Sequence, residues 1–83
     1  MPTVAVFDGI KIQFYWTEHP PPHFHAEYAE FVALIDIRTL EIVEGDLPKP
    51  QYRKVVAWAR PRLGELMRAW SVAAADENPG RIA

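Results

Sequence analysis

The fold is decided by residues 3–14, which read TVAVFDGIKIQF. Two runs of apolar, β-branched and aromatic residues flank Asp8-Gly9, and this pair suits a two-residue type I′ turn because both positions need a positive φ. The stretch therefore predicts a β-hairpin. Its strands should pair as Phe7–Ile10, Ala5–Ile12 and Thr3–Phe14, and these residues should form the face that a helix covers.

Further strands are predicted downstream of this hairpin. The hairpin itself consists of Thr3–Phe7 and Ile10–Trp16, and the extended, apolar-rich segments after it are Phe24–Tyr28, Phe31–Arg38 and, as a short fifth strand, Glu41–Glu44. If Ala29-Glu30 is a tight turn, counting back along both strands places His25 opposite Leu34 and His23 opposite Asp36.

After Pro50 the hydrophobic period becomes helical. Pro61 removes one backbone donor and crowds the preceding turn. The apolar stripe nevertheless stays in phase across it, which predicts one kinked helix over about residues 50–74. The stripe consists of Tyr52, Val55, Val56, Ala59, Leu63, Leu66, Met67 and Trp70.

These elements predict an α+β fold, in which a small antiparallel sheet of four to five strands is followed by one long, kinked C-terminal helix packed on one face. Residues 1–75 should form a single domain, and residues 76–83 a flexible tail. The second face of the sheet is more apolar than a solvated face should be. We therefore expect a homodimer or a partner protein to cover it. The apolar residues expected there are Val4, Val6, Tyr15, Val32 and Leu34.

The composition narrows the class of protein. A chain of 83 residues, 49% of them hydrophobic, fits one small domain. The absence of cysteine excludes a disulfide scaffold, a thiolate zinc site and a thiol nucleophile. No signal-like start and no apolar run of about 20 residues is present, so we expect a soluble, cytoplasmic protein that does not contact a membrane.

Charge is unevenly distributed along the chain. Residues 1–48 carry eight acidic side chains against Lys11 and Arg38, whereas residues 49–70 carry six basic side chains against Glu65. A solvated helix face explains this pattern more simply than a dedicated polyanion surface. The basic residues that could contact a partner or a phosphate group are Lys49, Arg53 and Arg60.

All three histidines lie within residues 17–25, which read TEHPPPHFH. His23 and His25 should project from the same side of a strand, with His19 as a third ligand, so the segment could bind a transition metal such as zinc. Alternatively, Asp36 could orient His23 or His25 for acid–base catalysis. In a third interpretation the imidazoles are structural: they bond to carbonyl groups and stack on Tyr15 or Trp16.

Three segments of the chain together resemble a known bacterial family. They are His19–His25 with its PPHFH motif, Asp36–Glu41, and Glu44–Pro48. The family is domain of unknown function 4160, and the resemblance extends from the first residues to Trp70. Members usually have Gly-Gly where this chain has Ala29-Glu30. The positions that the resemblance singles out are His19, Pro21, Pro22, His23, His25, Asp36 and Glu44.

The resemblance implies a small bacterial protein that is often encoded beside a second short protein, as in a toxin–antitoxin pair. Three functional hypotheses follow. The favoured one is a non-catalytic module that binds the neighbour-encoded protein through its apolar sheet face and basic helix. The second is a toxin-like ribonuclease with His23 or His25 as acid or base and with Lys49 and Arg53 on phosphate, although an acidic chain is a poor electrostatic match to nucleic acid. The third is a histidine-ligated metal protein.

Overall fold

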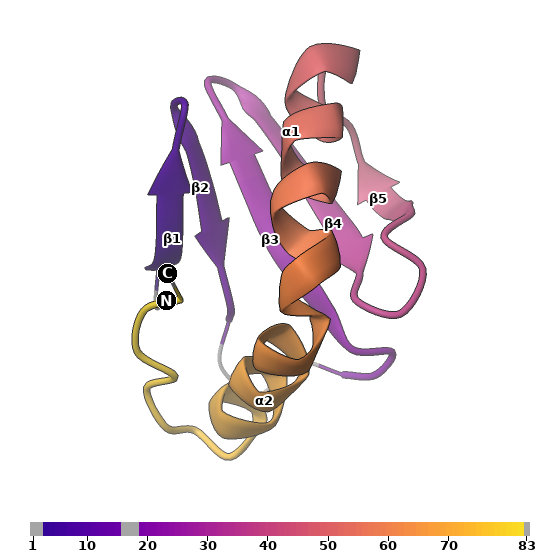
Figure 1. Ribbon diagram of the computed structural model, residues 1–83. Helices are drawn as coiled ribbons and strands as arrows, with labels where there is room; N and C mark the ends of the chain where they lie inside the picture. The colour runs from indigo at the N-terminus through magenta and orange to yellow at the C-terminus, as the bar shows by residue number, and fades with distance from the viewer. Residues whose placement is uncertain (1–2, 16–18, 83) are drawn as a thin grey trace.

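A computed structural model describes residues 3–15 and 19–82. Its sheet is a meander in which each strand pairs antiparallel with the next one along the chain (Figure 1). A helical segment follows the last strand, which confirms the predicted α+β fold. The strands are β1 (Thr3–Phe7), β2 (Ile10–Gln13), β3 (His23–Tyr28), β4 (Phe31–Asp36) and β5 (Ile42–Gly45).

The first hairpin forms around the predicted turn. Asp8 and Gly9 have φ values of 50° and 75°, and Phe7 pairs with Ile10, as predicted. The predicted pairing at the start of β1 is wrong: Thr3 lies opposite Gln13 rather than Phe14, because the register shifts between Thr3 and Ala5. Part of the predicted second strand, Trp16, lies outside the described residues.

The second hairpin, β3–β4, has the register predicted from a tight turn at Ala29-Glu30. Ala29 occupies the turn with a φ of 52°, and Tyr28 pairs with Phe31. As a consequence, His25 lies opposite Leu34 and His23 lies opposite Asp36.

The helical segment is one run with a kink, as predicted. It consists of α1 (Lys49–Ala59), a single 3₁₀ turn η1 (Arg60–Arg62) and α2 (Leu63–Ala74). Pro61 sits in the 3₁₀ turn, where it cannot donate to a preceding carbonyl. The guanidinium of Arg62 donates to the carbonyl oxygen of Trp58 at 2.7 Å and so satisfies one acceptor beside the kink. In Figure 1, α1 crosses in front of β3 and β4, and α2 turns away beneath them.

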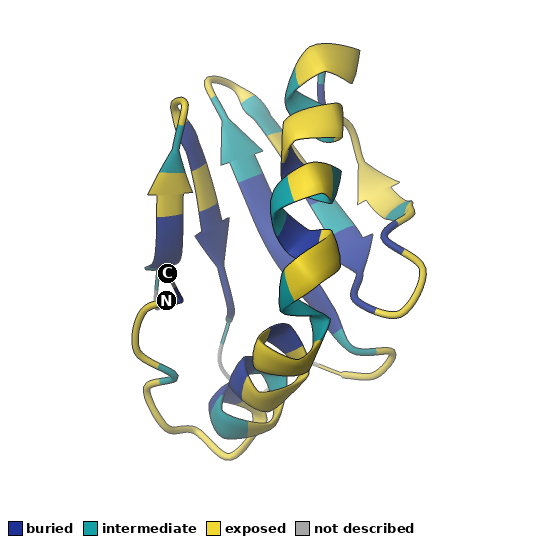
Figure 2. Ribbon diagram, in the orientation of Figure 1, coloured by how far each residue is buried: buried dark blue, intermediate teal, exposed yellow. Residues whose placement is uncertain are grey.

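The core lies between this helical layer and one face of the sheet. The helices contribute Val55, Ala59 and Leu66, and the sheet contributes large apolar side chains such as Phe24 and Ile35, all of them buried. Figure 2 shows the corresponding pattern, with the inner side of the helices buried and their outer side exposed. Among the described residues, no helix is both long and apolar enough to cross a membrane.

Val4 is not exposed, so it does not contribute to the apolar surface patch that was predicted. It falls at the register shift in β1 and is fully buried. Its carbonyl oxygen accepts a hydrogen bond from the backbone N–H of Ile82 at 2.8 Å, and Ile82 is itself buried. The flexibility of residues 76–83 stays a prediction, and this contact places their last described residue against β1.

We call the sheet surface away from the helices the open face. One cross-strand row on it is formed by Val6, Lys11, Glu27 and Val32. Val6 and Val32 are 52% and 40% exposed. The next row is formed by Gln13, His25, Leu34 and Glu44, of which Gln13 and His25 are buried. Exposure of the open face therefore falls from the hairpin turns toward the histidine loop.

Candidate functional site at the histidine loop

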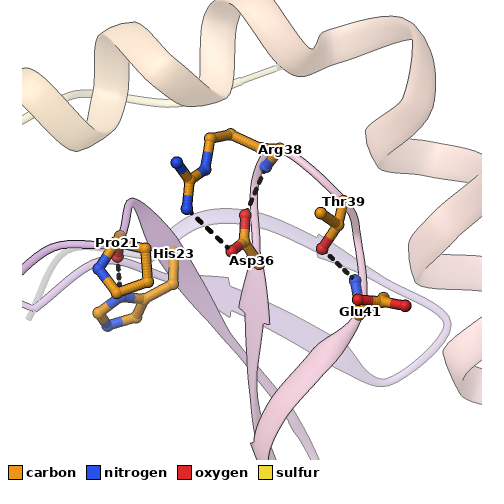
Figure 3. A network of polar contacts seen from close by, with 6 residues as sticks. All are labelled: Pro21, His23, Asp36, Arg38, Thr39 and Glu41. Carbon is orange, nitrogen blue, oxygen red and sulfur yellow. Dashed lines mark hydrogen bonds and ion pairs between the residues drawn. The ribbon is translucent and has the colours of Figure 1, made fainter.

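The proline-rich loop is held against its neighbours by backbone carbonyl groups. The carbonyl oxygen of Pro22 accepts a hydrogen bond from Ile37 N–H at 3.0 Å, which joins this loop to the loop after β4. The carbonyl oxygen of Pro21 lies 2.8 Å from Nδ1 of His23 (Figure 3). Because a carbonyl oxygen can only accept, this contact requires the proton on Nδ1 and fixes the orientation of the ring.

Four rings follow one another through the site, and we call them the ring row: Tyr15, His25, His23 and Trp70. Tyr15 stacks on His25 with 3.7 Å between ring centroids and 3° between planes. His25 and His23 follow at 5.5 Å, and His23 and Trp70 at 5.0 Å with tilted planes. Both imidazoles are 6% exposed. The ring row therefore connects the segment after β2, strand β3 and helix α2, with the two buried imidazoles between the half-buried rings of Tyr15 and Trp70.

Asp36 lies opposite His23 in the backbone register, but its carboxylate is engaged by Arg38. One oxygen accepts the backbone N–H of Arg38 at 2.7 Å, and the other lies 3.4 Å from the Arg38 guanidinium (Figure 3). Burial raises the pKa of Asp36, but the two hydrogen bonds and the positive charge of Arg38 outweigh burial and hold the pKa below its usual value. Asp36 is thus an ionised group that organises its own loop.

The loop after β4 depends on this arrangement. The carbonyl of Asp36 accepts a hydrogen bond from Leu40 N–H at 2.7 Å, and Leu40 is buried with a φ of 62°, which is unusual for a branched residue. The hydroxyl of Tyr52 on α1 donates to the carbonyl of Leu40 at 2.6 Å. The helical layer and this loop therefore hold each other in position.

These two loops and the strands between them lie within the part of the chain that matches a known family. Residues 9–71 match the family described as domain of unknown function (DUF4160). The chain belongs to this family. No curated protein and no solved structure matches this chain.

Most of the positions singled out from the DUF4160 resemblance have internal roles. Pro21, Pro22 and His23 fix the histidine loop, and Asp36 fixes the loop after β4. Gly45 has a φ of 80°, and a Cβ there would collide with the carbonyl oxygen of Val32. A residue other than glycine would therefore disturb the pairing of β5 with β4.

The three-histidine metal site stays a prediction in this DUF4160 protein. His19 is exposed, whereas His23 and His25 are buried in the ring row. Across residues 3–15 and 19–82, no three side chains of His, Asp or Glu are grouped so that they could hold a metal ion.

The basic candidates lie on the helical layer, which His23 also contacts through Trp70, whereas His25 lies on the open face of the sheet. Lys49, Arg53 and Arg60 are exposed on the helices, whose buried residues face the sheet. His25 projects from the opposite surface of the sheet, in one row with Leu34. The phosphate-contact and acid–base roles of these residues stay predictions.

Two members of the site were not predicted as such. Trp70 was expected only as a helix anchor, and its contact with His23 depends on the direction that α2 takes after the kink. The contact between Asp36 and Arg38 does have a sequence signal, because an aspartate commonly accepts a hydrogen bond from the backbone N–H two residues later. The stacking of His25 on Tyr15 follows the structural interpretation of the histidines.

Proposed function

We propose that this DUF4160 protein is a cytoplasmic protein-binding module of a toxin–antitoxin-like two-gene system, and that its open face contacts the neighbour-encoded protein. The observation that carries the proposal is the exposure of Val6 and Val32, at 52% and 40%, on that face. The two valines lie at the ends of one cross-strand row, on β1 and β4, with Lys11 and Glu27 between them. A partner that covers this row would remove both apolar side chains from water.

The chemistry of the open face indicates the kind of segment that it would bind. Glu27 lies in the same row as the two valines, and Glu44 is exposed in the next row beside Leu34. Lys11 is the basic side chain of these two rows. An apolar segment flanked by lysine or arginine would match both the valines and the carboxylates.

In this proposal the histidine loop supports the binding surface rather than reacting. The ring row ties β3 to α2, and the Pro22–Ile37 hydrogen bond ties the histidine loop to the loop after β4. These contacts hold one end of the open face rigid. A rigid surface loses less conformational entropy on binding than a mobile one.

Acid–base catalysis has less support than binding. A general acid or base must reach a substrate proton, and His23 and His25 are both 6% exposed. The carboxylate of Asp36, which would orient an imidazole, is hydrogen-bonded to Arg38.

The proposal is tested by co-expression with the neighbour-encoded protein and measurement of the affinity of the purified pair. Val6→Asp and Val32→Asp each place a charge in the contact and should weaken binding by about tenfold or more. Met67→Asp is the matched control, because Met67 is 37% exposed but lies on α2. Met67→Asp should bind like the parent.

Three results would contradict the proposal. The first is no complex on co-expression, and the second is a complex that neither valine substitution weakens. The third is a homodimer, seen by light scattering, that both valine substitutions dissociate while the neighbour-encoded protein stays unbound. That outcome would assign the open face to a second copy of the chain.

A further inference from the structure

The outer surface of the helical layer carries a line of basic side chains. Lys49, Arg53 and Arg60 are separated by four and seven residues, so they project from one side of the helical run. At a rise of about 1.5 Å per residue they extend over roughly 16 Å. Val55 and Ala59 on the inner side are buried against the sheet, and the outer side of α1 is exposed (Figure 2).

No side chain within residues 3–15 and 19–82 neutralises these three cations. Among the described residues, Lys54 pairs with Asp8 at 3.2 Å, but Lys49, Arg53 and Arg60 have no ion pair or side-chain hydrogen bond. The helical run contains one acidic residue, Glu65, against six basic ones. The charges of Lys49, Arg53 and Arg60 are therefore available to an external anion.

Small residues occupy positions along the line of basic side chains. Ala57 follows Arg53 by four residues, and Gly64 follows Arg60 by four, so both lie along the same line. Both are exposed, and a Cβ added at Gly64 would meet nothing within 4 Å. A polymer backbone could therefore approach the helices closely while the longer basic side chains contact its charges on either side.

We propose that Lys49, Arg53 and Arg60 bind the phosphodiester backbone of nucleic acid, without sequence preference. The inference is independent of the proposed function, because these side chains and the open face lie on opposite sides of the sheet. A row of evenly exposed cations matches a repeating anion better than it matches a single small ligand. No aromatic side chain lies on this line, so contacts to phosphate rather than base stacking would supply the affinity.

The net charge of −2 does not prevent this binding. Much of the acidic charge sits in the sheet and its turns, including Glu27, Glu30 and Glu44. A nucleic acid on the helices would face the basic side, with the sheet between it and most of those carboxylates. Charges that lie farther than about 8–10 Å from the contact are largely screened by salt, so the local charge rather than the net charge governs binding there.

The test is fluorescence anisotropy of a labelled 20-base-pair DNA duplex with the full chain in increasing salt. Three phosphate contacts should give a slope of about −2.7 for log affinity against log salt, or roughly a 40-fold loss between 50 and 200 mM. The triple variant Lys49→Gln, Arg53→Gln, Arg60→Gln should lose nearly all binding. Arg60→Gln alone should lower the slope by about 0.9.

A second triple variant separates the position of the charges from their number. The variant Lys11→Gln, Lys54→Gln, Arg81→Gln also removes three positive charges, but from exposed positions away from the line of Lys49, Arg53 and Arg60. It should therefore bind DNA with the same salt dependence as the parent. The proposal is overturned if this control binds as weakly as the first triple variant, or if the parent shows no binding at 50 mM salt. Equally tight binding of polyglutamate would also overturn it, because the surface would then fit an acidic protein.

Discussion

His25 lies flat against Tyr15, with 3.7 Å between the ring centroids and 3° between the planes. A polar ring that is 6% exposed is therefore covered by an aromatic ring from the end of the neighbouring strand. Stacking of this kind contributes packing as well as orientation. It makes the histidines part of the folded framework.

The double variant His23→Gln, His25→Gln should consequently be less stable than the parent. We expect the free energy of unfolding, measured by urea denaturation, to fall by about 1–3 kcal/mol, because three ring contacts and one hydrogen bond to Pro21 are lost. Below its unfolding transition, the variant should still bind the neighbour-encoded protein. Unchanged stability together with lost partner binding or lost zinc uptake would instead identify the histidines as a reactive or metal site.

Asp36 should make the protein sensitive to acid. Its pKa in the folded state is lowered by Arg38, so its carboxylate stabilises the fold above the unfolded pKa of about 3.9. That stabilisation is lost as the pH falls through the lower, folded pKa. Asp36→Asn should cost about 1–2 kcal/mol at pH 7 and flatten the dependence of stability on pH below about 5. Parallel pH profiles for the parent and the variant would contradict this role.

Ala29 should be a site where glycine stabilises the protein. Its φ of 52° is unfavourable for a residue with a Cβ, and the turn is exposed, so Ala29→Gly removes strain without losing a contact. The gain should be about 0.5–1 kcal/mol in urea denaturation. Ala57→Gly is the opposite control: Ala57 lies in an exposed helix interior, where glycine should cost about 1 kcal/mol.

Trp70 should anchor α2 on the end of the sheet. Trp70→Ala should lower the free energy of unfolding by about 3 kcal/mol, the lower end for large aromatic truncations because the side chain is partly buried. Trp70→Phe keeps a ring beside His23 and should cost less. Equal urea midpoints for Trp70→Ala and the parent would show that α2 is held by other contacts.

The sequence predicted the parts of this fold that depend on local chemistry. Asp8-Gly9 set the first turn, and the tight turn at Ala29 was enough to count the register to His23 and Asp36. Pro61 marked the kink, because a missing N–H disrupts a helix wherever the sequence places it.

The register of β1 and the partner of the Asp36 carboxylate were not predicted, because each depends on which of several possible contacts is made. The register of β1 shifts at Val4, where a hydrogen bond from distant Ile82 is made. Asp36 faces His23 in the register, yet its carboxylate bonds to Arg38, because a partner two residues away costs little entropy to reach. Neither outcome can be counted from strand spacing alone.

The hydrogen bond between Ile82 and Val4 also bears on how copies of this protein avoid one another. An outermost strand offers unpaired backbone groups that can recruit a strand from another molecule and seed fibre growth. In this protein the N–H of Ile82 occupies one of the unpaired carbonyl groups on the outer edge of β1. The other edge strand, β5, is four residues long and irregular in register, so it pairs poorly with a strand from another molecule. Shortening the chain before residue 82 would uncover the outer edge of β1, and an affinity tag is therefore better placed where it leaves Ile82 in contact.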